Sequence, residues 1–275
     1  MRCAWKELLE ILPQRLRREV DQQGRDGLQE LRLRFHAPPE LVLQGESRWL
    51  QGNITREELS FVVNAASRYS PWAAESMSQG FLTAPGGHRI GICGQAVYKE
   101  GRVGGMREIT SLCIRVARDF PELGDRLKGL HCSVLILGAP GWGKTTLLRC
   151  LIRQYAQNIQ VSVVDDRGEL FPDGFVRGAK MDVLTGCPKG EAMERVLRTM
   201  GPACIAVDEI TAEEDCKALI SAANCGVILL ATAHGASLRD FRTRPVYQRL
   251  SGQGVFDTLV TLKPDKSWQV ERITI

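Results

Sequence analysis

The chain has 275 residues, enough for one large domain or two modest domains with hydrophobic cores of their own. Its 36 basic and 32 acidic residues leave a net charge of only +4, which gives little reason to expect a nucleic-acid partner. Nine cysteines occur without a C-x-x-C pair, as expected of reduced thiols in a cytoplasm. Charged residues interrupt the N-terminus and every apolar run is shorter than about 18 residues, so we expect neither a signal peptide nor a membrane span.

The first segments predict short helices and strands. Apolar residues on one side of residues 4–20 predict a single amphipathic helix. Alternation over 28–34 predicts a half-buried strand, with short companion strands at 41–43 and 49–50.

A capping box predicts the next helix. Thr55 and Glu58 stand at the spacing in which each side chain bonds the other residue's backbone N–H. The helix is expected to run from there to about Tyr69, and Pro71 is a suitable first residue for a second short helix.

A hairpin is expected next, over residues 80–94, because two short β runs flank a Pro-Gly-Gly turn. Arg89 lies in its return strand, and Arg115 lies in a further strand expected over 112–118. Their spacing alone makes both arginines ordinary exposed strand residues.

A change in pattern divides the chain. Residues 120–128 have the composition of a linker, which places a domain boundary near residue 125. We expect a small α+β domain over 1–125. Strands and helices alternate over 126–275, which predicts an α/β domain with a parallel sheet.

A phosphate-binding loop follows the first strand of this second domain. The sequence reads G-x-x-x-x-G-K-T after an apolar strand at 133–137 and before a helical pattern. In such a loop backbone N–H groups surround nucleotide phosphates, the lysine reaches the β and γ phosphates, and the threonine hydroxyl faces Mg²⁺. The residues expected to bind a nucleoside triphosphate are Gly138, Ala139, Pro140, Gly141, Trp142, Gly143, Lys144, Thr145 and Thr146.

Acidic residues follow two later strands. The strand at 161–164 ends in Asp165-Asp166-Arg167-Gly168-Glu169, where α/β sheets hold ligands, although a polar turn would look the same. The strand beginning at Cys204 ends in Asp208 and Glu209. We expect Asp208, with Thr145, to hold Mg²⁺ and Glu209 to deprotonate the attacking water.

A histidine ends the next core strand, which is expected over 227–233. His234 is therefore expected at the same edge of the sheet as the phosphate loop, as a γ-phosphate sensor or as a plain turn residue. The remaining expected elements are helices at 190–200 and 211–224 and an antiparallel pair of strands at 255–262 and 268–275.

The order of these motifs resembles the secretion-ATPase superfamily, the RecA-like motors of type II and type IV secretion and of type IV pili. The Walker A loop, "Asp box", Walker B strand and "His box" of that family match residues 138–145, 165–169, 204–209 and 232–235. The resemblance implies a RecA-like P-loop NTPase core that hydrolyses ATP with Mg²⁺. It also makes Glu169 and His234 candidate catalytic residues beside Glu209.

A closer resemblance, over nearly the whole chain, is to the family of stage III sporulation proteins AA. Residues 80–94, 185–189 and 233–235 carry it, and Asp166 stands where that family would have a glutamate. It implies a ring-forming ATPase of endospore-forming bacteria, expected to be a hexamer. The ATPase would be cytoplasmic, or peripheral at the mother-cell side of the forespore membrane, with membrane-embedded channel components as partners.

The resemblance also gives the two arginines a role. In the pilus motors, the equivalent hairpin and strand of the N-terminal domain bring arginines to the nucleotide. Arg89 and Arg115 match those positions, so they are expected to be catalytic, either within one subunit or across a subunit boundary.

The combined interpretation is a motor ATPase that energises a secretion-like channel complex during endospore formation. RecA-like cores also serve helicases, so a nucleic-acid-dependent translocase or recombinase is one alternative. The slight net charge and the lack of a basic patch interleaved with aromatic residues argue against it. A nucleotide-gated assembly scaffold is the other alternative, and Glu209 argues against that one.

Overall fold

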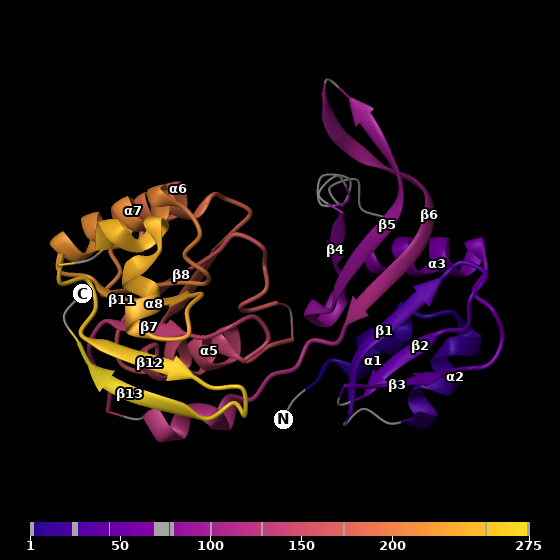
Figure 1. Cartoon of the computed structure of the whole chain (residues 1–275), viewed down its shortest axis with the longest axis horizontal. Helices are drawn as coiled ribbons and strands as arrows, with labels where there is room; N and C mark the ends of the chain where they lie inside the picture. Colours follow the sequence, from indigo (N-terminus) through magenta and orange to yellow (C-terminus); the bar gives the residue numbers. More distant parts are fainter. Residues whose placement is uncertain are drawn as a thin grey trace. The chain divides into compact units, whose positions relative to one another are not determined.

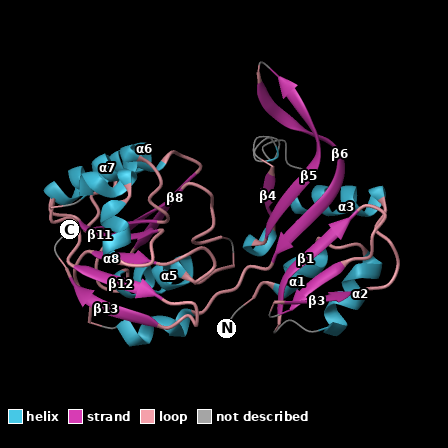
Figure 2. Ribbon diagram, viewed as in Figure 1, coloured by secondary structure: helices cyan, strands magenta, loops and turns pink. Residues whose placement is uncertain are grey.

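Two compact units make up the chain (Figure 1). The computed structural model describes residues 3–23, 27–43, 45–68, 77, 80–99, 101–127, 129–172, 174–250 and 252–273. The first unit comprises Met1–Asp119 with Pro172–Phe175, and the second comprises Phe120–Phe171 with Val176–Ile275. Both units combine helices and strands (Figure 2). The boundary predicted near residue 125 falls within the 3₁₀ helix η2 (Pro121–Leu127) and remains a prediction.

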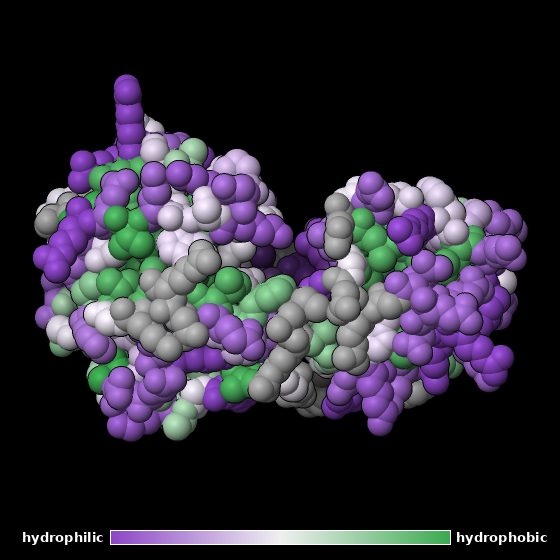
Figure 3. Space-filling view, turned by 90° about the horizontal axis from the view of Figure 1, so that it is seen from below, coloured by the Kyte–Doolittle hydropathy of each residue, from purple (hydrophilic) through white to green (hydrophobic). Residues whose placement is uncertain are grey.

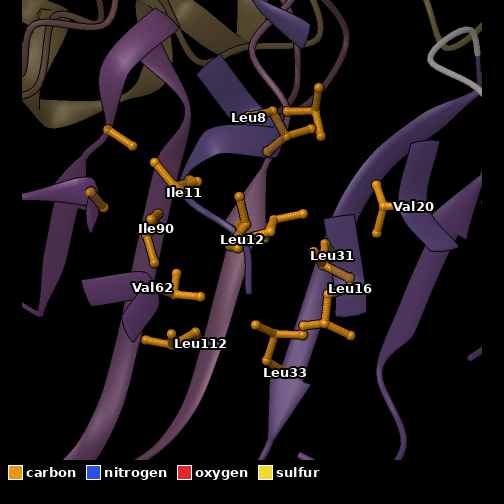
Figure 4. Packing of buried hydrophobic residues seen from close by; sticks show 14 of the residues in the cluster. Leu8, Ile11, Leu12, Leu16, Val20, Leu31, Leu33, Val62, Ile90 and Leu112 are labelled. Atoms are coloured by element: carbon orange, nitrogen blue, oxygen red, sulfur yellow. The ribbon is translucent and has the colours of Figure 1, made fainter. Parts of the chain in front are cut away.

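An antiparallel sheet of six strands forms the first unit, in the order β3-β2-β1-β6-β5-β4. Its strands are β1 (Leu28–Arg34), β2 (Glu40–Leu43), β3 (Glu46–Trp49), β4 (Phe81–Thr83), β5 (Arg89–Lys99) and β6 (Arg102–Arg115). In parts of β1, β5 and β6 alternate residues face the core, where Leu31, Ile90 and Leu112 pack with apolar residues of three helices (Figure 4). The helices are α1 (Trp5–Glu10), α2 (Gln14–Gln23) and α3 (Arg56–Ala66).

The single helix predicted over residues 4–20 is wrong, because α1 and α2 are separate helices. The break lies at Pro13, whose ring lacks a backbone N–H and disfavours helical backbone in the residue before it. The capping box is confirmed: the Glu58 N–H donates to Thr55 Oγ1 over 3.2 Å, and the Thr55 N–H donates to Glu58 Oε2 over 3.1 Å. The helix expected from Pro71 lies outside the described residues.

The hairpin over residues 80–94 is confirmed. Strands β4 and β5 pair antiparallel around a short 3₁₀ turn, η1 (Pro85–Gly87), in which Gly86 and Gly87 have φ of 76° and 78°. Strand β6 is longer than expected and pairs with β5 so that Arg89 and Arg115 are directly opposite each other. Both arginines are therefore neighbours on the sheet face away from the hydrophobic core.

A seven-stranded sheet forms the second unit, in the order β13-β12-β7-β11-β10-β8-β9. All its pairings are parallel except the pairing of β12 with β13, which is antiparallel as predicted. The strands are β7 (Val134–Leu137), β8 (Val161–Asp165), β9 (Met181–Thr185), β10 (Cys204–Val207), β11 (Ile228–Ala233), β12 (Thr258–Leu262) and β13 (Trp268–Arg272).

Helices cover both faces of this sheet, so the second unit has three layers. Residues of α5 (Lys144–Tyr155) pack on one face with Leu127 of η2. The other face is covered by α6 (Lys189–Thr199), α7 (Glu213–Asn224), α8 (Leu238–Thr243) and the 3₁₀ helix η3 (Pro245–Leu250). The linker predicted at 120–128 is thus wrong in part, because Leu127 is buried in the core against α5.

Large hydrophobic residues on the described surface are scattered, and the face shown in Figure 3 mixes hydrophilic and hydrophobic residues. The exposed large hydrophobic residues are Trp49, Phe61, Val97, Tyr98, Leu123, Met200 and Val270. Among the described residues, none of the helices has the length and apolar character that crossing a membrane requires.

Candidate active site

Four neighbouring parallel strands deliver the predicted site residues of the second unit to one edge of the sheet. Strands β7, β11, β10 and β8 lie side by side. Their carboxyl ends lead into the glycine-rich loop, His234, the Asp208-Glu209 pair and the acid-rich turn, respectively. This edge is where α/β sheets bind ligands, and the parallel register follows from the strand–helix alternation of the sequence.

The glycine-rich loop links β7 to α5. Gly141 and Gly143 have φ of 78° and 103°, a region that residues with a β-carbon rarely adopt. Gly143 is the N-cap of α5, so the first N–H groups of that helix, without partners inside the helix, face the loop. At Gly138 there is little room for a side chain, because a β-carbon there would lie 3.1 Å from Leu262 Cβ. The loop therefore has the backbone geometry that surrounds phosphates.

Lys144 lies in this loop with its ammonium group turned inward. Its Nζ donates to Ala139 O over 3.1 Å and lies 3.2 Å from His234 Nδ1. Burial lowers the pKa of Lys144, and the nearby carboxylates of Asp208 and Glu209 oppose that shift. An ammonium group has three N–H donors, so one remains for a phosphate oxygen.

Two threonine hydroxyls hold Asp208. Thr145 Oγ1 donates to Asp208 Oδ2 over 2.8 Å, and Thr232 Oγ1 donates to Asp208 Oδ1 over 2.6 Å. Thr232 Oγ1 also accepts the N–H of Glu209 over 2.8 Å. The carboxylate of Asp208 and the hydroxyl of Thr145 are hard oxygen donors brought together from two strand ends, which suits Mg²⁺.

Glu209 follows Asp208 with a left-handed backbone, at φ 55°. That conformation costs a residue with a β-carbon about 1–2 kcal/mol, so surrounding contacts must maintain it. His234 Nε2 lies 2.7 Å from Glu209 Oε1, and Arg167 Nη1 lies 3.5 Å from Glu209 Oε2. Burial alone would raise the pKa of Glu209, but the hydrogen bond from His234 and the charges of Arg167 and Lys189 lower it below its ordinary value.

These contacts fix the tautomer of His234. Lys144 can only donate, so Nδ1 of His234 accepts from it. The ring proton of a neutral imidazole is then on Nε2, which donates to Glu209. One imidazole thus connects the lysine of the phosphate loop to the carboxylate proposed to deprotonate water.

The acid-rich turn is organised by its first residue. Asp165 accepts the N–H of Glu169 over 2.9 Å and that of Leu170 over 2.7 Å. Burial raises the pKa of Asp165, although these backbone hydrogen bonds oppose the shift. Asp165 therefore shapes the turn. Asp166, Arg167 and Glu169 line a small hollow together with Asp165, Lys189, Asp208 and Glu209.

The structure brings Lys144, Thr145, Asp208, Glu209 and His234 into one connected network and places Glu169 at the same hollow. Arg89 and Arg115 belong to the first unit. There they border a cavity of about 190 Å³ with Phe81, Gly91 and Cys113.

The side chain of each of these arginines contacts a neighbouring residue of the first unit. The Arg89 guanidinium carbon lies 4.5 Å from the centroid of the Phe81 ring. Arg115 Nε lies 3.8 Å from Glu30 Oε1.

The sequence assigns three contributors no role of their own in the site. Thr232 and Lys189 lie in segments 232–235 and 185–189, which carry the family resemblance, but neither residue type indicates its contacts in the site. The Tyr247 hydroxyl accepts the N–H of His234 over 3.3 Å and donates to Ile210 O over 3.2 Å, from a part of the chain with no predicted element.

Comparisons with known proteins agree with this architecture. The chain is 33% identical to the stage III sporulation protein AA of Bacillus subtilis (strain 168) over 282 residues, covering 94% of this chain and 91% of that protein. It is also 28% identical to the uncharacterized protein ycf45 of Porphyra purpurea, covering 92% of this chain and 45% of that protein.

Two solved structures share the fold. The pilus retraction motor PilT with bound ADP has a TM-score of 0.66 at 16% identity, covering 98% of this chain and 84% of that one. The ATPase DotB of Legionella pneumophila has a TM-score of 0.61 at 17% identity, covering 94% and 79%. The expected α/β fold, with a RecA-like core and a smaller α+β part, is confirmed. Because the family described as "Sporulation stage III, protein AA" matches residues 4–273, the chain belongs to that family.

Proposed function

We propose that this protein is a Mg²⁺-dependent ATP hydrolase. The observation that carries the proposal is the continuous network from Lys144 through His234 to Glu209, beside the pair formed by Thr145 and Asp208. It combines a phosphate-binding loop, a pair of oxygen ligands for a metal ion and a carboxylate base at one sheet edge. The fold shared with the pilus retraction motor PilT and the ATPase DotB supports the same activity.

The glycine-rich loop would bind the nucleotide. Backbone N–H groups of residues 138–146, except Pro140, which has none, and the remaining N–H of Lys144 would bind the phosphate oxygens. Thr145 and Asp208 would hold Mg²⁺, which when bound neutralises charge on the β and γ phosphates.

Glu209 would act as the base. It accepts a proton from water as the water oxygen bonds to the γ-phosphorus, and the bond to the β–γ bridging oxygen breaks, so that ADP leaves with that electron pair. Its carboxylate form is available because its pKa is lowered. His234 holds one carboxylate oxygen, and Glu169 is the next candidate for the base because it lines the same hollow.

Arg89 and Arg115 would stabilise charge that builds up on the γ-phosphoryl group. Their proposed role rests on their adjacent positions on β5 and β6 and on the resemblance to pilus motors. An arginine delivered to the transition state is worth about 10³–10⁵ in rate. Mixing an arginine variant with a phosphate-loop variant decides whether the arginines act within one subunit or on a neighbour's nucleotide.

At the level of the assembly, we propose a hexameric ring that energises a membrane-embedded channel complex during endospore formation. The ring would be cytoplasmic, at the mother-cell side of the forespore membrane. The native mass of the protein with a slowly hydrolysed ATP analogue tests the ring, because six chains of 30.5 kDa are expected. A monomeric mass would overturn this part of the proposal.

Phosphate release from ATP by the purified protein tests the function. We expect turnover that requires Mg²⁺, is unchanged by single-stranded DNA and increases with the channel components. Stimulation by DNA would favour a translocase, and tight ATP binding without turnover would favour a nucleotide-gated scaffold.

A further inference from the structure

Lys189 is a buried lysine that neither its helix nor the hydrophobic core explains. It is the first residue of α6, and only 6% of it is exposed. A positive charge is unfavourable at the N-terminal end of a helix, and burying an ammonium group is unfavourable without partners. The apolar contacts of α6 come from Ala192, Met193 and Val196 instead. The position of Lys189 must therefore be maintained by its polar contacts.

Those contacts join three segments of the second unit. Lys189 Nζ donates to the backbone oxygen of Glu209 over 2.7 Å and to Thr211 Oγ1 over 3.3 Å. It also lies 3.8 Å from Asp166 Oδ2. One ammonium group thus connects the acid-rich turn after β8, the residue that follows Asp208, and the segment that leads into α7.

The contact with Glu209 occurs where the backbone is strained. Glu209 has φ of 55°, and both of its backbone polar groups are held by side chains rather than by a strand. Its N–H donates to Thr232 Oγ1, and its oxygen accepts from Lys189. A left-handed residue persists only where its surroundings favour it over the ordinary conformations. Among the contacts of the described residues, Lys189 is the only charged side chain that forms a hydrogen bond with the backbone of Glu209.

We infer that Lys189 is a positioning residue for hydrolysis. It holds the left-handed backbone of Glu209 so that the carboxylate points at the attacking water. Its ion pair with Asp166 connects this backbone segment to the acid-rich turn. The inference rests on the proposed function, in which Glu209 is the base. It also gives Asp166 a role, as a partner of the positioning lysine rather than a base.

The direct test replaces Lys189 by methionine, which keeps the length of the side chain and removes the charge and the donors. Lys180→Met is the matched control, because Lys180 is exposed and its Nζ also donates to a backbone oxygen, that of Asn158, over 2.8 Å. Lys189→Met is expected to lower kcat about 10- to 100-fold with KM changed less than about threefold, as for a small misplacement of a catalytic group. Lys180→Met should leave both constants unchanged. A folded Lys189→Met protein with the turnover of the control overturns the inference.

A double-mutant cycle with Glu209→Gln separates positioning from general damage. If Lys189 acts through Glu209, adding Lys189→Met to Glu209→Gln lowers the single-turnover rate by less than about threefold. A full second loss in the double variant overturns the inference while the role of Glu209 stands. If Glu209→Gln itself retains normal turnover, the proposed base is wrong and so is the inference built on it.

Hydrogen exchange without nucleotide gives a readout apart from activity. Peptides covering residues 205–212 should exchange faster in Lys189→Met than in Lys180→Met, because the strained segment loses a backbone contact. Equal exchange in the two variants contradicts the inference. If Lys189→Met fails to fold, Lys189→Gln keeps an amide donor group but loses the charge, and its kcat should still fall below that of the wild type. Wild-type kcat in that variant overturns the inference.

Discussion

At the scale of single residues, Glu209 and His88 illustrate two uses of a constrained side chain. Glu209 is held in a strained backbone by Thr232 and Lys189, while His234 holds its carboxylate. His88, the residue before Arg89, is fully buried in the first unit, where its ring forms hydrogen bonds with two backbone groups. Each of the two makes a separate prediction.

Glu209→Gln is expected to keep ATP binding and lose hydrolysis, because the amide preserves shape but does not accept the proton of water. Removing a general base lowers the rate about 10²–10⁴-fold. Binding of a fluorescent ATP analogue and phosphate release, measured on the same sample, separate the two effects. If the rate of hydrolysis falls by less than about tenfold, Glu169 rather than Glu209 is the general base.

His88 predicts a pH dependence of stability. Its Nδ1 accepts the N–H of Ala117 over 3.1 Å, so its Nε2 carries the proton and donates to Ala4 O over 2.8 Å. Burial lowers the pKa of His88 in the folded protein, although the bond to Ala4 and the charge of Glu7 oppose the shift. Below the ordinary pKa of 6.5 the unfolded chain therefore binds a proton that the folded chain does not.

The contribution of His88 to the free energy of unfolding is therefore fully present above pH 6.5. It is lost as the pH falls through the pKa that His88 has in the folded protein. Urea unfolding of the wild-type protein and of His88→Gln between about pH 5 and pH 7.5 checks this, since glutamine can form both bonds without titrating. The variant should lose less stability on acidification. The same loss in both proteins would show that His88 does not titrate in this range.

At the scale of elements, the glycine-rich loop depends on backbone conformation more than on space. Gly143 has φ of 103° at the N-cap of α5, yet a β-carbon there would have no atom within 4 Å. Gly105 in β6 also has no atom within 4 Å of such a β-carbon, and its φ lies outside the left-handed region. The two glycines form a matched pair for substitution.

Gly143→Ala should reduce the free energy of unfolding by about 1 kcal/mol and weaken ATP binding, because alanine disfavours the left-handed backbone that the loop requires. Gly105→Ala should leave ATP binding unchanged and should not lower the free energy of unfolding. Urea unfolding and ATP-analogue titration of both variants measure the difference. Equal behaviour would show that the conformation of Gly143 does not shape the phosphate site.

Much of the site could be predicted because its motifs follow strands whose order and direction are set by strand–helix alternation. The parallel sheet brings the loop, Asp208 and His234 to one edge without any further information. The contacts of Lys189 and Thr232 could not be predicted, because each partner lies at least 20 residues away in the sequence and depends on tertiary packing. Strand β9 and helix α8 were missed because their patterns are short, and the break at Pro13 was missed although proline signals it.

At the scale of the whole molecule, Arg89 and Arg115 belong to one compact unit and the phosphate loop to the other. If a neighbouring subunit supplies the arginines, mixing Arg115→Ala protein with Lys144→Ala protein should restore part of the activity that each lacks. A mixed ring would then contain some sites with both an intact loop and an intact arginine. Phosphate release by the mixture, compared with each variant alone, measures this, and no recovery would favour action within one subunit. Wild-type turnover in both Arg89→Ala and Arg115→Ala would remove these arginines from the mechanism.

If ATP is hydrolysed at the loop that contains Lys144, Lys144→Ala protein should release no phosphate from ATP. Lys144 is the only charged side chain from residue 138 to residue 146, so its loss should abolish nucleotide binding and turnover. Lys180→Ala, at an exposed lysine of the same unit, is the control and should release phosphate at the wild-type rate. With both variants shown to be folded by their unfolding curves, we expect no Mg²⁺-dependent phosphate release from Lys144→Ala. Normal turnover by that folded variant would contradict this expectation.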